Sequence, residues 1–290
     1  MRVGVHGKEI SAKKMPIVER VLELIIENQA QPVLSEALGL QCKKEGIKTK
    51  FEIFKPGENL QELKFMLSLG GDGTLLETVS YVGKSLVPVL GINLGRLGFL
   101  ATINQEEITL AIQKLFEGAY LLDERAMLRL ETNKDLFGQT NFALNDLTIM
   151  KKDSAAMITV HAHIDGSFLN SYWADGLIVS TPTGSTGYNL SCGGPLVFPR
   201  SGSFVLTPVS PHNLTTRPII LPDQAVIKLE VEGRSKQFLI TLDSRVATGD
   251  QNLEITIRKE SFTARLIQLE GQNYFKTLRQ KLNWGFDIRN

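Results

Sequence analysis

The stretch that decides the fold runs from residue 63 to residue 82 and reads LKFMLSLGGDGTLLETVSYV. Its apolar first part, 63–69, predicts a buried strand, and 75–82 has the apolar spacing of a helix. Between them, the glycines of Gly70-Gly71-Asp72-Gly73-Thr74 let the backbone turn sharply. The exposed amides of such a loop and of the following helix N-terminus suit phosphate oxygens. The stretch therefore predicts an α/β unit with an anion-binding turn.

The aspartate in the middle of this turn allows two interpretations. Its charge would repel a phosphate, so Asp72 makes functional sense if it binds a metal or accepts a proton from an attacking hydroxyl. The other interpretation is an ordinary strand-to-helix turn in which Asp72 is the helix N-cap. The pattern is neither GxGxxG nor a Walker loop, because no Gly-Lys-Ser/Thr follows. Hydride transfer and P-loop chemistry are therefore disfavoured.

Strands and helices alternate on both sides of this turn. Further strands are expected at 2–6, 48–54 and 86–92, and further helices at 16–29, 34–45 and 106–116. Such alternation predicts a parallel sheet covered on both faces. We therefore expect a Rossmann-like α/β domain over residues 1–120.

The character of the chain changes after about residue 120. Short β-rich runs follow one another at 126–131, 141–150, 157–164, 177–180, 226–232, 238–242, 253–258 and 262–269. Asp165-Gly166 is a hairpin signal between two such runs. Many short strands with turn signals predict an all-β, β-sandwich-like domain, here over 121–269. Residues 273–282 are helical again, and we expect 270–290 to pack back on the N-terminal domain.

Composition excludes several classes of protein. The 290 residues carry 32 Lys+Arg and 31 Asp+Glu, a net charge of +1, which argues against bulk binding to nucleic acid or an anionic membrane. No apolar run approaches about 18 residues, so no membrane span is expected. The two cysteines, Cys42 and Cys192, form no CxxC site or disulfide framework and favour a reducing, cytoplasmic location.

Two polar stretches in the β-rich half are candidates for a ligand site. Asn145-Asp146 interrupts an otherwise apolar strand, which indicates an edge position, a bulge, or side chains aimed at a ligand. Residues 181–187 combine hydroxyls, two glycines and a proline, which suits a sugar or adenine pocket or a polar loop between strands.

The turn GGDGT after a buried strand resembles the NAD kinases, the diacylglycerol and sphingosine lipid kinases and, more loosely, the phosphofructokinases. Other segments separate these families. Segments similar to those of NAD kinases occur in family order and with family spacing at 91–100 (GINLGRLGFL), 143–146 (ALND), 174–188 (ADGLIVSTPTGSTGY), 208–214 (PVSPHNL), 217–218 and 242–244. The resemblance thus covers most of the chain, from residue 70 to about residue 245.

The resemblance implies transfer of the terminal phosphoryl group of ATP to the 2′-hydroxyl of the adenosine ribose of NAD. It makes Asp72 the proton acceptor and the ligand of that ribose, with a divalent cation such as Mg²⁺ on the phosphates. The phosphate loop would be Gly70, Gly71, Gly73 and Thr74. The adenosine half of NAD would contact Asn145 and Asp146, and Asp175 would lie towards the nicotinamide. The remaining NAD contacts implied are Thr186, Gly187, Tyr188, Asn189, Leu190, Ser191 and Arg245, with Ala156 and Trp173 as further candidates.

Four residues depart from the family pattern. Glu77 stands where a basic residue or histidine is common, and a carboxylate there favours a metal over a phosphate. Asp146 replaces the usual Glu, Gly187 replaces Ala and Asn189 replaces Ser. Because Asp72 is retained, the resemblance implies a working enzyme.

Two alternative functions stay open at this point: a lipid kinase that shares the turn, and a non-catalytic NAD-sensing protein. By analogy with NAD kinases we expect a homodimer or homotetramer, and the partners are NAD and ATP rather than nucleic acid or membrane. The sequence leaves open whether polyphosphate replaces ATP as donor and whether NADH is accepted.

Overall fold

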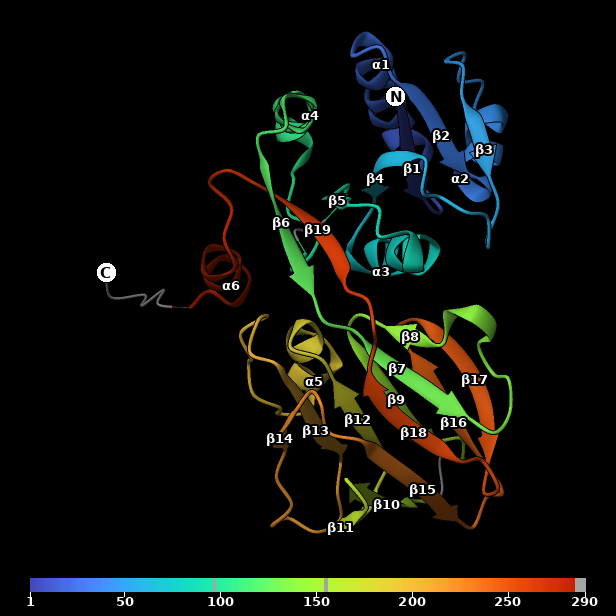
Figure 1. Cartoon of the computed structure of the whole chain (residues 1–290), viewed down its shortest axis with the longest axis vertical. Helices are drawn as coiled ribbons and strands as arrows, with labels where there is room; N and C mark the ends of the chain where they lie inside the picture. The colour runs from blue at the N-terminus through green and yellow to red at the C-terminus, as the bar shows by residue number, and fades with distance from the viewer. Residues whose placement is uncertain (96–97, 154–155, 285–290) are drawn as a thin grey trace. The chain divides into compact units, whose positions relative to one another are not determined.

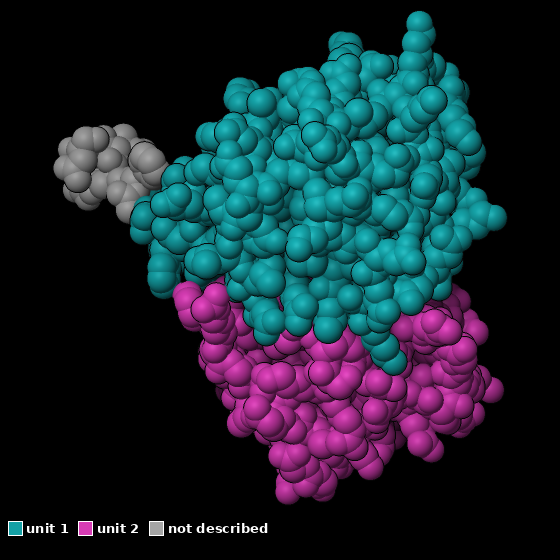
Figure 2. All heavy atoms as spheres, turned by 45° about the horizontal axis from the view of Figure 1, so that its top comes forward, with its two compact units in different colours: residues 1–124, 265–290 teal, residues 125–264 magenta. Residues whose placement is uncertain are grey.

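The computed structural model describes residues 1–95, 98–153 and 156–284. Arg96 and Leu97, part of the segment 91–100, lie outside the described residues, as do residues 285–290 of the C-terminal segment. The chain divides into two compact units, Met1–Glu124 with Arg265–Asn290, and Arg125–Ala264, which Figure 2 colours separately. None of the described helices combines the length and the apolar character needed to cross a membrane.

Unit 1 is built on a seven-stranded sheet with the order β3-β2-β1-β4-β5-β19-β6 (Figure 1). Strands β1 to β5 pair in parallel, and β19 pairs in parallel with β5. The strands are β1 (Arg2–Gly7), β2 (Gln31–Ser35), β3 (Glu52–Phe54), β4 (Leu63–Leu69), β5 (Val89–Ile92), β6 (Tyr120–Arg125) and β19 (Ala264–Leu269). The chain runs outward from β1 in both directions, so the strand order reverses between β1 and β4, where ligands bind in open α/β sheets.

Helices cover this sheet through their apolar stripes. Apolar side chains of α1, α2 and α4 join those of the strands in one core cluster, while α3 packs against β4 and β5. The helices of this unit are α1 (Met15–Glu27), α2 (Glu36–Lys44), α3 (Asp72–Val82), α4 (Ile108–Glu117) and α6 (Tyr274–Leu282), with short 3₁₀ turns at Ala12–Lys14, Gly83–Ser85 and Gln105–Glu107. The helix α6 belongs to this unit, and the packing of residues 270–290 on the N-terminal domain stays a prediction.

Unit 2 is a sandwich of two six-stranded sheets with antiparallel pairing, ordered β11-β10-β15-β18-β7-β8 and β14-β13-β12-β9-β16-β17. Side chains from both sheets meet in one core, including Leu147 and Leu177 from one and Val160 and Ile257 from the other. The strands are β7 (Leu128–Thr132), β8 (Phe142–Ala143), β9 (Asp146–Lys151), β10 (Ile158–Ile164), β11 (Ser167–Ala174), β12 (Gly176–Ser180), β13 (Ser203–Val209), β14 (Ile219–Pro222), β15 (Ile227–Gly233), β16 (Gln237–Leu242), β17 (Arg245–Asp250) and β18 (Ile255–Lys259).

The structure departs from the local expectations at several places. Strands β6, β13, β14 and β17 were not expected, and the strands expected at 48–54 and 86–92 are shortened to β3 and β5. A strand, β2, occupies Gln31–Ser35, so the helix expected from residue 34 begins only at Glu36. The strand expected over 141–150 is broken at Leu144-Asn145 into β8 and β9. The contact-based units change after Glu124 and after Ala264, where β6 and β19 lie side by side in the first sheet (Figure 1).

Candidate active site

The glycine-rich turn lies at the carboxyl end of β4, beside the point where the strand order reverses. Asp72 is the first residue of α3, and the N-cap position belongs to Gly71, with no side-chain cap. The interpretation of Asp72 as a helix N-cap is therefore wrong.

The Asp72 carboxylate instead binds a backbone segment about 28 residues further along. Oδ2 accepts the amide of Phe99 at 2.7 Å, and Oδ1 accepts those of Leu100 and Ala101, both at 3.0 Å. Gly98 allows this approach, since a Cβ there would lie 1.9 Å from Oδ1. A carboxylate offers about four acceptor positions, so one on Oδ2 remains for a further donor. The aspartate is thus fixed in place and can still orient a hydroxyl.

Gly71 and Gly73 expose their backbone at positions where a side chain would fit without a clash. A Cβ on either residue would meet no described atom within 4 Å, and neither has a positive φ. Gly70 differs, because a Cβ there would lie 2.2 Å from Thr74 Oγ1. The packing of this unit thus does not require glycine at either position, and the bare backbone allows a ligand to approach closely. Phosphate binding at these two glycines stays a prediction.

Gly73→Ala tests this account. Because the site has room and an ordinary backbone, we expect the thermal midpoint to change little, or to rise slightly. Activity should fall at least tenfold, because the methyl group occupies the space of the ligand. Steady-state kinetics and thermal unfolding of the same preparation measure both. Unchanged kinetic constants would show that nothing approaches this backbone.

Glu77, further along α3, lies between two basic side chains. Its Oε1 is 3.6 Å from Lys8 Nζ and its Oε2 is 3.7 Å from His6 Nε2. His6 is fully buried with Nδ1 2.8 Å from Ser35 Oγ; burial lowers the pKa of His6, and Glu77 opposes that effect. Within the described ranges, no three His, Cys, Asp or Glu side chains form a cluster that could hold a metal. Glu77 thus has Lys8 and His6 as neighbours.

Asn145 and Asp146 lie in unit 2, where the interrupted strand resumes as β9. Along β9, Leu147 and Ile149 face the sandwich core, so Asp146 and Thr148 project from the outer face of the sheet. Burial raises the pKa of Asp146 to about 7, helped by the nearby Asp243 charge and opposed by the hydrogen bond from Thr148 Oγ1 at 3.1 Å. The half-buried Asn145 has a buried Oδ1 with no hydrogen-bond partner among the described residues. A buried amide oxygen without a partner is costly and indicates a ligand.

The loop after β12 folds against these two side chains. Ser180, the last residue of β12, pairs with Asp146, and the chain then turns through 183–186. Gly184 lies so close that a Cβ would be 2.2 Å from the Asn145 carbonyl oxygen. A Cβ on Gly187 would be 3.4 Å from Asn145 Nδ2. The structure therefore brings Gly187 together with Asn145 and Asp146, and the half-buried Thr186 is its neighbour in the chain.

The short helix α5 (Tyr188–Ser191) presents an aromatic ring next to this loop. Tyr188 is 40% exposed, and an exposed aromatic ring can stack on a base. Burial raises the pKa of its phenol, and Cys192, Asp175 and Asp146 add to the rise. Its hydroxyl is thus within electrostatic range of two carboxylates. Leu190 is half-buried and Ser191 is exposed on the same helix.

Two of the predicted NAD contacts are engaged by the protein itself. The fully buried Asn189 amide donates to the carbonyls of Ser185 and Pro195, both at 3.1 Å, and accepts from Thr207 Oγ1 at 2.6 Å. The Arg245 guanidinium donates to the carbonyl oxygens of Thr140, Phe142 and Leu242. Both side chains therefore support the loops of the site, and their direct contact with NAD stays a prediction.

Three further predicted residues lie away from Asn145 and Asp146. Asp175 precedes β12 at the end of the strand opposite to Ser180, and its Oδ1 is 2.6 Å from Lys151 Nζ. The exposed Trp173, at the end of β11, has its ring 4.2 Å from that of His212. Ala156 is half-buried just before β10. Of these three residues, Asp175 lies close enough to Tyr188 to raise the pKa of its phenol, as Asp146 does.

Sequence reasoning missed two residues that organise the site. Gly98 makes room for the Asp72 carboxylate, and Asp243 binds the backbone of residues 144–146. Both lie in segments that resemble NAD kinases, but nothing local connects them with their partners. Aspartate is common at such hairpin turns, so the local sequence around Asp243-Ser244 carries no signal of this role.

The comparisons with known proteins identify the family of the chain. The model of the ATP-NAD kinase N-terminal domain matches residues 9–120, and that of the ATP-NAD kinase C-terminal domain matches residues 144–269. The chain is 47% identical to an NAD kinase of Cytophaga hutchinsonii and 41% identical to one of Flavobacterium psychrophilum, with all of each chain covered.

Solved structures are similar over nearly the whole chain. An Archaeoglobus fulgidus NAD kinase in complex with ATP has a TM-score of 0.75 at 26% identity, covering 98% of this chain and 99% of that one. Yeast NADH kinase complexed with NADH has a TM-score of 0.87 at 22% identity, covering 100% and 89%, and shows the shared fold. Both halves of the chain thus match, and the chain belongs to the ATP-NAD kinase family.

Proposed function

We propose that the chain uses Asp72 to orient the 2′-hydroxyl of the adenosine ribose of NAD while the terminal phosphoryl group of ATP is transferred to it. One observation carries the proposal: the Asp72 carboxylate is fixed by three backbone amides, with one Oδ2 position left, next to the bare backbone of Gly71 and Gly73. Phosphoryl transfer depends mainly on position and charge stabilisation, so a fixed acceptor suits it. Asp72 takes the hydroxyl proton as the new O–P bond forms and ADP leaves.

The adenosine half of NAD is proposed to bind at Asn145 and Asp146. The Oδ1 of Asn145, which no described residue contacts by a hydrogen bond, suits the amino group of adenine, and an ionised Asp146 suits two ribose hydroxyls. Thr186 and the exposed ring of Tyr188 would contact the adenine, with Gly187, Leu190 and Ser191 beside them. Asp175 would lie towards the nicotinamide.

A divalent cation, Mg²⁺ by expectation, is proposed to enter with ATP. The described residues hold no cluster of three metal-ligating side chains, so they do not fit a dedicated metal cage. The phosphates of ATP can supply most of the ligands themselves, as is usual for Mg²⁺. Its chemistry there is neutralisation of phosphate charge.

The remaining properties are proposed by analogy. We propose a homodimer or homotetramer in the cytoplasm, with NAD and ATP as its partners. Light scattering of the purified chain measures the oligomer, and a mass of one chain at micromolar concentration would contradict it.

The experiment that tests the function supplies purified protein with ATP, NAD and Mg²⁺ and measures NADP with an NADP-specific dehydrogenase. We expect NADP and ADP in equal amounts. Saturable NAD binding without ADP would support the NAD-sensing alternative instead. Phosphorylation of a lipid, with no NADP formed, would support the lipid kinase.

A further inference from the structure

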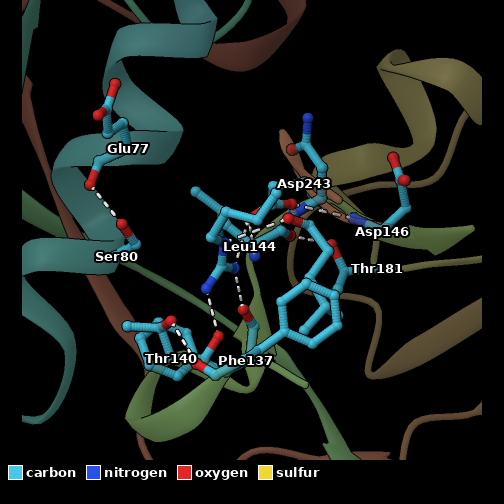
Figure 3. Close-up of polar contacts among 12 residues, drawn as sticks. Glu77, Ser80, Phe137, Thr140, Leu144, Asp146, Thr181 and Asp243 are labelled. Atoms are coloured by element: carbon cyan, nitrogen blue, oxygen red, sulfur yellow. Dashed lines mark hydrogen bonds and ion pairs between the residues drawn. The ribbon is translucent and has the colours of Figure 1, made fainter. Parts of the chain in front are cut away.

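Asp243 binds three consecutive backbone amides. Its Oδ2 accepts Leu144 N at 3.0 Å, and its Oδ1 accepts Asn145 N at 2.8 Å and Asp146 N at 3.3 Å (Figure 3). Its own amide donates to the Asp146 carbonyl at 3.0 Å. The Asp243 side chain is 4% exposed, and Arg245 is its cationic neighbour at 3.9 Å. The break between β8 and β9 is thus held by one buried carboxylate.

The same segment is held from its other side by Thr181. Thr181 N donates to the Asn145 carbonyl at 2.8 Å, and Thr181 Oγ1 donates to the Leu144 carbonyl at 2.5 Å (Figure 3). The backbone of Leu144 and Asn145 is therefore fully bonded, with amides towards Asp243 and carbonyls towards Thr181. The buried Oδ1 of Asn145, by contrast, has no hydrogen-bond partner among the residues that the structure describes. A backbone fixed on both sides presents that side chain in one orientation.

Asp243 adopts a left-handed backbone conformation at a hairpin turn. Asp243-Ser244 is the two-residue turn between β16 and β17, with Leu242 paired to Arg245. Asp243 has φ +52°, in a region that aspartate enters more readily than most residues, as Asp165 does at φ +50°. Aspartate therefore tolerates this turn, and its carboxylate supplies three amide contacts that a glycine could not.

We propose that Asp243 is a positioning residue for NAD: it fixes the backbone of residues 144–146 so that Asn145 and Asp146 meet the adenosine half in one geometry. The inference rests on the proposed role of those two side chains. Asp243 itself is bonded to backbone amides and needs no contact with the substrate.

The test compares Asp243→Gly and Asp243→Asn with the parent enzyme. Glycine keeps the turn and removes the carboxylate, so the hairpin still forms. Asparagine tolerates the positive φ but turns a donor towards one of the amides. We expect the KM for NAD to rise about 10- to 100-fold in both, from the loss of hydrogen bonds to a charged group. The KM for ATP should stay within about threefold, as no ATP contact is altered.

The pH dependence of kcat/KM for NAD gives a second measurement, because partial unfolding would not shift its acidic limb. The titratable groups facing Asp146 are Asp243 from the β16–β17 turn, Tyr188 from α5 and Cys192 directly after that helix, with Arg245 beside Asp243. Removing the Asp243 charge relieves the repulsion that helps raise the pKa of Asp146. The acidic limb of kcat/KM for NAD should therefore move to lower pH in both variants.

Asp165→Gly is the matched control. Asp165 is also an aspartate at positive φ (+50°) in a two-residue turn, between β10 and β11, and its Oδ1 accepts Val226 N at 2.9 Å. Its KM for NAD should equal that of the parent. The inference is overturned if the Asp243 variants have a KM for NAD within threefold of the parent and the acidic limb of their kcat/KM profile does not shift. If Asn145→Ala and Asp146→Ala also leave KM unchanged, the proposed NAD site itself is wrong.

Discussion

Asp72→Asn lowers turnover about 10²- to 10⁴-fold, the usual loss when a general base is removed. The asparagine retains one oxygen for the amides of Leu100 and Ala101, but its amino group then faces the amide of Phe99. The variant thus loses both the proton acceptor and one contact to the 99–101 segment. We expect a fall of about 1–3 kcal/mol in unfolding free energy alongside the loss of turnover.

The two effects separate when stability and kinetics are measured on the same sample. Asp153→Asn is the control, because Asp153 is an exposed carboxylate between β9 and β10. It should leave both turnover and unfolding free energy unchanged. Turnover of Asp72→Asn within a few-fold of the parent, measured on folded protein at saturating NAD and ATP, would remove Asp72 from the reaction.

Asp146→Asn is expected to weaken NAD binding and to stabilise the free protein. The asparagine can still accept from Thr148 but lacks the charge that accepts two ribose hydroxyls. Its stabilising effect follows from the pKa of Asp146, which burial raises from 3.8 to about 7. Ionising that carboxyl in the folded state at pH 8 costs on the order of 2–4 kcal/mol, and the variant escapes this cost.

The raised pKa of Asp146 determines how the stabilisation by Asp146→Asn changes with pH. Between about pH 4 and pH 7 the unfolded chain has lost the Asp146 proton and the folded chain still holds it, so stability falls as pH rises through this window. The gain from Asp146→Asn should therefore be larger at pH 8 than at pH 5. Urea unfolding at both pH values measures it. An equal gain, or a loss at pH 8, contradicts a raised pKa.

Local features of the sequence were sufficient for part of the site. The strand Leu63–Leu69, the glycine turn after it and the helix that follows are specified by neighbours in the chain, and they form as expected. The same holds for the hairpin at Asp165-Gly166, where both residues have positive φ. Periodicity and turn chemistry act over a few residues, so they can be read without knowing the rest of the fold.

The sequence by itself determined the α/β-then-β architecture, the family and the candidate residues at 70–74, 145–146 and 186–188. Only the tertiary structure decided which backbone amides the buried carboxylates bind. Asp72 binds amides 27 to 29 residues away, and Asp243 binds amides 97 to 99 residues away. The strand β19 likewise completes a sheet whose other members lie at least 139 residues earlier, since β6 ends at Arg125 and β19 begins at Ala264. A buried carboxylate must find donors wherever the fold places them, and no local pattern specifies which amides those will be.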